Sequence, residues 1–342
     1  MITKYVITLF ILLLTILSSY GQIESTKRLL SNNNVIHFGS EITVSDFSAN
    51  ITPQLEGTAV VMDSMGDILF TANGTTIYDK IWNIVKNGDN LDGSITGNTA
   101  QTPIVLQRPR FETQYYVFYT KDHLDSEKEG DLKYSIIDIC DENNEMSILT
   151  DRKNIAIEGD FSERLHIVEI DRNNYWLLAT KLFERRLLAY KINELGIYSN
   201  PVISDIDNSF DGQIGQIKTN NSKTKLAWSS TFTNTARLSI YDFDINTGKV
   251  ANQKIITNND IYGIEWTSSD QFLYYTDIYD GSGVYSYSFN DESIKPLFER
   301  SGHYQVGDLK LSPQKNRIIV SQSHNNKLGE ITDLENGGLY SE

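Results

Sequence analysis

The sequence has 342 residues, of which 39% are hydrophobic and 22% are charged, so it can bury a full core and is not a disordered chain. Its 45 Asp and Glu residues outnumber its 30 Lys and Arg residues, and the formal net charge of −15 argues against a protein that binds nucleic-acid phosphates through charge. The 19 Tyr, 14 Phe and 22 Gly residues, with only 6 Pro, favour strands and turns over helices.

The first 21 residues have the pattern of a secretory signal peptide. Lys4 precedes an apolar run over residues 6–17, and small residues lead to a cleavage point after Gly21. The apolar run is shorter than the ~20 residues of a membrane-spanning helix. We therefore expect residues 1–21 to be removed and 22–342 to form a single exported domain without a transmembrane segment, located in the periplasm, at the cell surface or outside the cell.

The rest of the chain repeats one pattern of strands. Residues 57–71 contain an alternating apolar strand, a polar turn from Asp63 to Asp67 and a denser apolar strand, and most later units add a third and a fourth strand. Repeats of about 40 to 50 residues with four short strands are typical of β-propeller blades. A β-sandwich also has short strands, but it does not predict tandem units with the same internal order. Six such units begin near residues 57, 101, 162, 214, 261 and 305.

The ends of the chain affect the number of blades. Residues 35–47 precede the first unit, and they could form outer strands that pair with the C-terminal stretch 327–340. A blade shared between the two ends would leave no open sheet edge. The preferred prediction is therefore an all-β propeller with seven four-stranded blades, and the alternatives are six blades or an imperfectly closed ring.

Several motifs resemble one known family. They are HFG at residues 37–39, DSMGDILFTANGTTIY at 63–78 and GDLKLSP at 307–313. Together they look like a secreted WD40/YVTN-like β-propeller family of gliding bacteria that use the type IX secretion route. The resemblance covers about residues 35–331 and implies a bacterial, exported propeller, here without the C-terminal sorting domain that relatives usually carry.

No catalytic motif is found, and no catalytic residue is predicted. Cys140 follows an apolar strand, which favours a packed thiol over a nucleophile. A single cysteine also excludes an internal disulfide. The histidines are isolated in sequence, without a metal-binding pair, although distant blades could still combine them at the ring axis. They are His37, His123, His166, His303 and His324.

One acidic stretch could bind calcium. The alternating Asp205, Asp207 and Asp211 could place oxygen ligands around one ion. However, Gly212 comes two residues too late for a standard calcium loop, and no closing acid follows. A solvated turn between blades is therefore the favoured interpretation, and a calcium site is the alternative.

Four aromatic residues near predicted strand ends are candidates for ligand binding, because aromatic rings stack on sugars and anchor protein interfaces. Packing between blades is the competing interpretation. The four are Trp82, Tyr262, Trp266 and Tyr304.

Two functions follow from these observations. The preferred hypothesis is a monomeric, non-catalytic propeller that binds a protein or a glycan at the cell envelope, with no cofactor. The alternative is a propeller enzyme of lactonase or hydrolase type, with a metal ion or an acid pair in the central channel.

Overall fold

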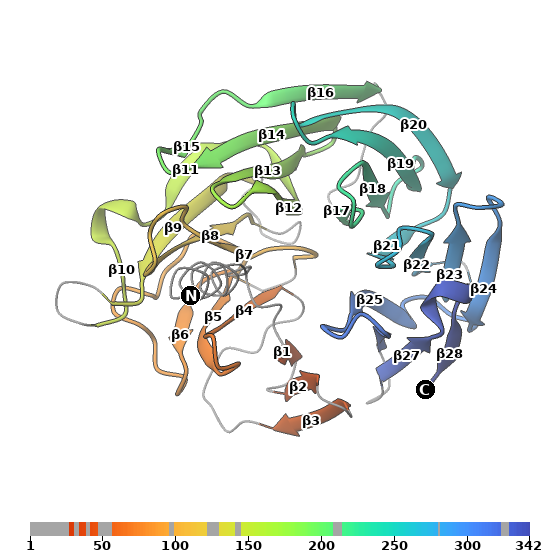
Figure 1. The fold of residues 1–342 in the computed structure, drawn as a ribbon, viewed down its shortest axis with the longest axis horizontal. Helices are drawn as coiled ribbons and strands as arrows, with labels where there is room; N and C mark the ends of the chain where they lie inside the picture. The colour runs from red at the N-terminus through yellow and green to blue at the C-terminus, as the bar shows by residue number, and fades with distance from the viewer. Residues whose placement is uncertain are drawn as a thin grey trace, which may run out of the picture.

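The computed structural model describes residues 27–30, 34–38, 42–46, 57–95, 99–121, 130–140, 145–207, 214–279, 281–322 and 328–342. Its strands form seven antiparallel sheets that follow one another around a ring (Figure 1). The helical segments in these ranges are the 3₁₀ turns Thr150–Arg152 and Leu334–Asn336. No helix within them is long and apolar enough to cross a membrane. The all-β propeller fold is confirmed, whereas the expected signal peptide lies outside the described residues.

The sheets are built from consecutive strands. The first two sheets contain β1 (Lys27–Leu30), β2 (Asn34–Phe38) and β3 (Ile42–Asp46), then β4 (Thr58–Met62), β5 (Ile68–Asn73) and β6 (Ile77–Asp79). The third contains β7 (Ile104–Gln107), β8 (Gln114–Tyr119), β9 (Leu132–Asp138), β10 (Ser147–Ile148) and β11 (Ile155–Glu158). The fourth contains β12 (Phe161–Asp171), β13 (Asn174–Lys181), β14 (Arg185–Asn193), β15 (Gly196–Ile197) and β16 (Val202–Asp207).

The last three sheets have four strands each. They are β17 (Ile217–Thr219), β18 (Lys225–Ser230), β19 (Arg237–Asp244) and β20 (Lys249–Thr257); β21 (Ile261–Trp266), β22 (Phe272–Asp277), β23 (Gly283–Ser288) and β24 (Ile294–Glu299); and β25 (Val306–Leu311), β26 (Ile318–Gln322), β27 (Leu328–Thr332) and β28 (Leu339–Ser341).

The first strand of each repeat unit lies nearest the ring axis, and the later strands lie progressively outward (Figure 1). The six predicted unit starts coincide, within a few residues, with the first residues of β4, β7, β12, β17, β21 and β25. Local turns produce this order. In the β4–β5 turn, Asp63 Oδ1 accepts hydrogen bonds from Met65 N and Asp67 N, and Gly66 adopts a positive φ of 84°.

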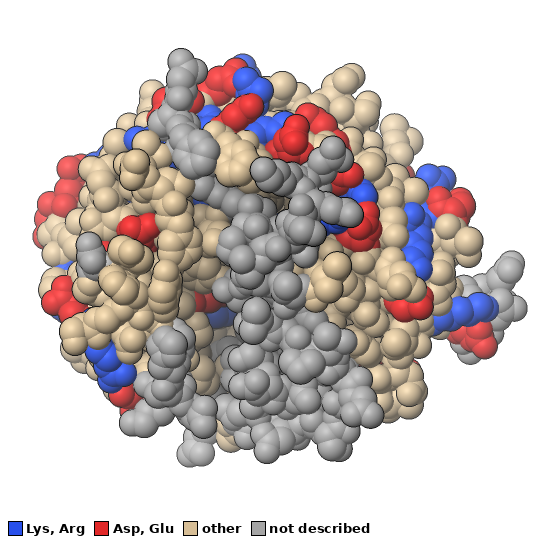
Figure 2. All heavy atoms as spheres, turned by 180° about the vertical axis from the view of Figure 1, so that it is seen from behind, with Lys and Arg blue, Asp and Glu red and all other residues tan. Residues whose placement is uncertain are grey.

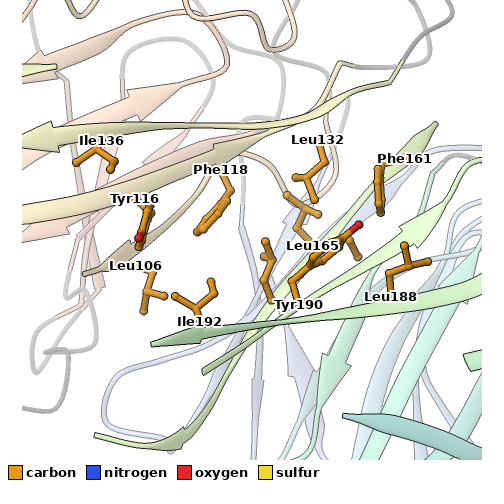
Figure 3. Close-up of a cluster of buried hydrophobic side chains, with 12 residues drawn as sticks. Leu106, Tyr116, Phe118, Leu132, Ile136, Phe161, Leu165, Leu188, Tyr190 and Ile192 are labelled. Atoms are coloured by element: carbon orange, nitrogen blue, oxygen red, sulfur yellow. The ribbon is translucent and has the colours of Figure 1, made fainter. Parts of the chain in front are cut away.

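The core lies between neighbouring sheets. Figure 3 shows the cluster between the third and fourth sheets, where Tyr116 and Phe118 on β8 face Tyr190 and Ile192 on β14. Similar clusters lie between the second and third sheets and between each later pair of neighbours, and one of them contains the fully buried Trp228. Burial of such side chains stabilises each interface by about 1.5 to 3 kcal/mol per large residue.

The predicted blade shared between the chain ends is wrong. Strands β1, β2 and β3 pair with one another, while β27 and β28 complete the sheet of β25 and β26. The reason is a tight turn before β28: Asp333, Gly337 and Gly338 all have positive φ, and Gly338 N donates to Asp333 O. This turn returns the chain to β27, so the C-terminal strand cannot reach the N-terminal sheet.

The ring is therefore joined at this point by side-chain packing. Ile36 on β2 is buried against Ile319 and Leu328 of the last sheet. Six blades come from residues 57–342, which is the alternative count given by the sequence. The preferred count of seven would require the small β1–β2–β3 sheet to serve as a further blade.

Candidate functional site

Four inner strands that lie nearest the ring axis (Figure 1) carry polar side chains that interact electrostatically. They are His166 on β12, Lys218 on β17, Glu265 on β21 and Lys310 on β25, and we call them the axial cluster. Lys218 Nζ donates to Glu265 Oε2 at 3.1 Å and to Ile264 O at 3.0 Å. Glu265 Oε2 also accepts a hydrogen bond from Leu311 N at 2.9 Å. These contacts link three consecutive blades.

Charge at the axis is set by the two lysines. Burial alone would raise the pKa of Glu265, but the ammonium groups of Lys218 and Lys310 outweigh it and hold that pKa below its usual value. Burial, followed by the same two lysines, lowers the pKa of His166 to about 3. At neutral pH the axial cluster therefore contains two ammonium groups, one carboxylate and a neutral imidazole.

A layer of amide and carboxylate side chains lies beside the axial cluster. Gln216 Nε2 donates to Asp308 Oδ1 at 2.7 Å, and Gln216 Oε1 accepts from Ile264 N at 3.2 Å. Gln101 reaches from the segment before β7 to Ile217 on β17, where its side chain pairs with both backbone groups at 2.9 Å. These side chains hold the inner strands together by hydrogen bonds.

A second candidate site lies on the ring face where the β18–β19 and β22–β23 loops and the β24–β25 connection emerge. It consists of Phe232, Tyr279, His303 and Tyr304, which we call the surface aromatic cluster. The Tyr304 ring centroid lies 5.9 Å from that of Phe232 and 6.3 Å from that of Tyr279, and the Tyr279 ring stacks on His303 at 4.2 Å. The Phe232, Tyr279 and Tyr304 side chains are nevertheless 46%, 40% and 43% exposed.

Backbone hydrogen bonds hold this cluster in place. Phe232 and Tyr304 have φ values of 61° and 57°, which bulky residues rarely adopt. Asp260 Oδ1 accepts from Phe232 N at 2.5 Å and from Thr231 Oγ1 at 2.9 Å, and Tyr304 N donates to Ile278 O at 2.7 Å. Left-handed aromatic residues cost of order 1 to 3 kcal/mol each, and the hydrogen bonds to Phe232 N and Tyr304 N help to hold these conformations.

The structure separates the four aromatic residues proposed from the sequence. Tyr304 belongs to the surface aromatic cluster. Tyr262 and Trp266 are buried on β21, where Trp266 stacks on Phe289 and donates from Nε1 to Lys218 O at 3.0 Å. Trp82 is half-buried in the turn after β6, at the opposite ring face. Ligand binding by Trp82, Tyr262 and Trp266 stays a prediction.

The two described residues of the predicted calcium site lie on the outermost strand of the fourth sheet. Arg186 Nε donates to Asp205 Oδ1 at 2.6 Å, and Arg237 Nη2 donates to Asp207 Oδ2 at 3.1 Å. Asp211 lies outside the described residues. Within the described ranges, no group of His, Cys, Asp and Glu residues is arranged to hold a metal ion. The calcium site stays a prediction.

Two further sequence expectations concern histidine and cysteine. The expected packed thiol is wrong, because Cys140 is exposed. It follows the end of β9, where Cys140 N donates to Asp138 Oδ1 at 3.1 Å. His166 and His303 each lie in one of the two clusters, His37 lies on β2, and His123 and His324 are outside the described residues.

Charged residues on one face of the ring are intermixed. Figure 2 shows Lys and Arg residues lying among Asp and Glu residues, on the described part of that face, instead of in one broad field. Specific local contacts are therefore more relevant to recognition on this face than a long-range field of one sign.

The fold defines a β-propeller. Solved structures with similar folds include a candidate 6-phosphogluconolactonase from Bacteroides uniformis, with a TM-score of 0.54, 10% identity, and 90% of each chain covered. A protein from Lactobacillus plantarum has a TM-score of 0.53 at 10% identity, covering 90% of this chain and 89% of that one. The β-propeller domain of Cps50 (Swd1) from Myceliophteria thermophila has a TM-score of 0.51 at 7% identity, covering 90% and 96%.

These low identities establish similarity of fold alone. No protein-family model matches the sequence, and no curated protein matches it either.

Proposed function

We propose that this chain is an exported, non-catalytic β-propeller that binds a protein or a glycan at the cell envelope through the surface aromatic cluster. The observation that carries the proposal is the exposure of three adjacent rings, Phe232, Tyr279 and Tyr304, contributed by three separate connections. Aromatic side chains combine large contact area with low conformational entropy, and for this reason they dominate binding surfaces.

The surrounding contacts support binding by a preformed surface. Asp260 and the backbone of Ile278 fix the conformations of Phe232 and Tyr304, so little ordering is needed when a ligand arrives. Preorganised groups of this kind reduce the entropy cost of association.

The lactonase or hydrolase alternative has less support. Glu265 is paired with Lys218 and Leu311 N, and Glu163 Oε2 accepts from Ala100 N at 2.9 Å. Carboxylates already bonded within the protein are less suited to general acid or base catalysis than a perturbed pair facing a substrate.

The experiment compares two tyrosines with the same exposure on opposite faces. Tyr304→Ser removes a ring from the surface aromatic cluster, whereas Tyr198→Ser removes an equally exposed ring, also 43%, after β15. The immobilised unmodified protein is first incubated with a glycan panel and with envelope extract to capture ligands. The affinity of each captured ligand for the unmodified protein and for both variants is then measured by surface plasmon resonance. We expect Tyr304→Ser to weaken binding at least about tenfold and Tyr198→Ser to leave it unchanged.

If the unmodified protein and both variants bind every captured ligand with equal affinity, the proposal that the surface aromatic cluster binds the ligand is contradicted. Turnover of a lactone by the unmodified protein, lost on treatment with a chelator, favours the enzyme alternative.

We also propose that the protein is exported and that its ring has seven blades. The signal-like residues 1–21 and the resemblance of residues 63–78 to the type IX family support an exported bacterial protein. The burial of Ile36 against Ile319 supports the β1–β2–β3 sheet as a small seventh blade.

A further inference from the structure

The exposed rings of the surface aromatic cluster continue onto a further blade at Phe183. The β13–β14 loop carries Phe183, the β18–β19 loop Phe232 and the β22–β23 loop Tyr279, in each case two residues after the second strand of the sheet. These three sheets follow one another around the ring (Figure 1). Phe183 is 51% exposed, and its φ of 62° matches the 61° of Phe232. Three neighbouring loops therefore present an exposed ring at the same ring face.

Hydrogen bonds between blades hold these loops next to one another. Arg185 Nη2 donates to Ser230 Oγ at 3.0 Å, which joins the end of the β13–β14 loop to the start of the β18–β19 loop. Asp260 joins that loop to the next one, because its Oδ1 accepts from Phe232 N and its backbone oxygen accepts from Ile278 N at 3.0 Å. The positions of the rings relative to one another are thus fixed by the protein.

Uncharged polar groups lie among the rings. Residues 231–236 and 301–305 contain no Lys, Arg, Asp or Glu, and Asn234 is exposed, with an amide that can donate and accept hydrogen bonds. His303 Nδ1 lies 2.8 Å from Tyr279 O. Because a carbonyl oxygen only accepts, Nδ1 carries the hydrogen, and Nε2 of the neutral ring is an acceptor. Donors and acceptors therefore accompany the aromatic surface.

This combination of groups is suited to a carbohydrate. The apolar faces of sugar rings stack on aromatic side chains, and sugar hydroxyl groups both donate and accept hydrogen bonds. A strongly charged partner would find little charge to complement, since Glu184 beside Phe183 is paired with Arg186 at 3.1 Å. Rings on adjacent blades favour a chain of sugars over a single unit, because each linked unit that reaches a further ring binds at a high effective concentration.

We propose that the surface aromatic cluster and Phe183 together bind a linear, uncharged oligosaccharide, with successive sugar units contacting rings on neighbouring blades. The inference rests on the proposed function, and it names the ligand class for that surface. A protein ligand at the same surface is the outcome that would contradict it.

The test uses the purified protein and three uncharged linear probes, cellohexaose, maltohexaose and N-acetylchitohexaose, each beside the disaccharide of its series. Titration calorimetry measures the dissociation constants. We expect at least one hexasaccharide to bind, about tenfold more tightly than its disaccharide.

Two phenylalanine variants locate the chain on the surface. Phe183→Ser removes the ring of the outlying blade, whereas Phe111→Ser removes an exposed ring, 39%, from the β7–β8 turn at the opposite ring face. We expect Phe183→Ser to weaken binding of the hexasaccharide about tenfold, to the level of the disaccharide, and Phe111→Ser to leave it unchanged. If Phe183→Ser does not fold, the dependence on chain length in the unmodified protein decides.

Three results overturn the proposal. They are the absence of binding by all three hexasaccharides at millimolar concentration, a disaccharide that binds as tightly as its hexasaccharide, and equal affinity of the hexasaccharide for the Phe183→Ser, Phe111→Ser and unmodified proteins. The proposed function fails separately. If no oligosaccharide binds but Tyr304→Ser weakens binding of an envelope protein, the glycan proposal is wrong and the surface aromatic cluster is still a binding surface.

Discussion

Ser229 on β18 joins two neighbouring blades through one hydroxyl group. Its Oγ accepts a hydrogen bond from Gln216 N of its own blade at 2.8 Å and donates to Tyr262 O of the next blade at 2.9 Å. The next blade repeats the arrangement: Thr276 Oγ1 accepts from Gly263 N at 2.9 Å and donates to Gly307 O at 2.7 Å. A hydroxyl at the end of the second strand thus fixes the next inner strand.

Removal of this hydroxyl is expected to destabilise the ring. Ser229→Ala leaves Gln216 N and Tyr262 O without their buried partner, which costs about 1 to 3 kcal/mol. Urea unfolding followed by tryptophan fluorescence measures the change. Ser293→Ala is the matched control, because the Ser293 hydroxyl donates to Asp291 Oδ1 in an exposed turn. Equal stability of the Ser229→Ala protein and the unmodified protein would contradict a role in joining blades.

The turn before β28 depends on glycine. A Cβ at Gly338 would lie 2.8 Å from Ile331 Cγ2 and 2.8 Å from Tyr274 Cε1. Gly281 has a similar positive φ of 78°, with no atom within 4 Å of a Cβ. In both Gly→Ala variants the left-handed backbone lowers the free energy of unfolding by about 1 kcal/mol. Only Gly338→Ala also overpacks its surroundings, which typically lowers it by a further 1 to 3 kcal/mol. Thermal unfolding of the two variants measures the difference; equal losses would show that the C-terminal turn is loosely packed.

The pH dependence of stability follows from His166. Its folded-state pKa of about 3 lies below the ordinary value of 6.5, so below about pH 6.5 the unfolded chain binds one proton more than the folded protein. Stability is then lost as the pH falls, by about 1.4 kcal/mol per pH unit. Glu265, whose ordinary pKa is 4.5 and is lowered in the fold, adds a loss in the same direction only near and below that value.

Unfolding free energies between pH 6.5 and 5.5 therefore report chiefly on the histidine, because carboxyl groups stay largely ionised in both the folded and the unfolded chain in that range. His166→Gln, which keeps an acceptor for Thr219 N, should reduce the slope in this window relative to the unmodified protein. An unchanged slope means that His166 titrates normally in the folded protein.

Packing of the first sheet is tested at Ile36. Ile36→Asn places a polar group against Ile319 and Leu328, and it should detach the β1–β2–β3 sheet while residues 57–342 stay folded. Limited proteolysis should then cleave near residues 31–56 at a higher rate than in the Thr43→Asn control, which changes an exposed position on β3. Equal cleavage rates would argue against this sheet as a blade.

Much of the fold could be predicted because it is local. Most units have a short polar turn with one positive-φ residue between their first two strands, as at Gly66, Asp270 and Lys315, so the unit starts match the inner strands. Closure could not be predicted in this way. It depends on the positive φ of Gly337 and Gly338, and glycines by themselves do not indicate which strand the returning chain will pair with.

The candidate sites were harder to predict. His166, Lys218 and Glu265 lie on different strands about 50 residues apart and form no motif. Tyr304 and Trp266 both lie near strand ends, yet one is exposed and the other buried, because orientation relative to the neighbouring blade decides burial. The exposure of Phe232 and Tyr279 could not be predicted for the same reason. Their positions in short loops between strands are the sequence feature that points to the surface.

The central claim is that the surface aromatic cluster binds the ligand. Hydrogen–deuterium exchange of the protein, alone and saturated with a ligand retained from the envelope or the glycan panel, tests it most directly. We predict slower exchange at residues 231–236 and 301–305, with unchanged exchange at residues 80–83 and 194–198 on the opposite face. Slower exchange confined to the opposite face would contradict the account.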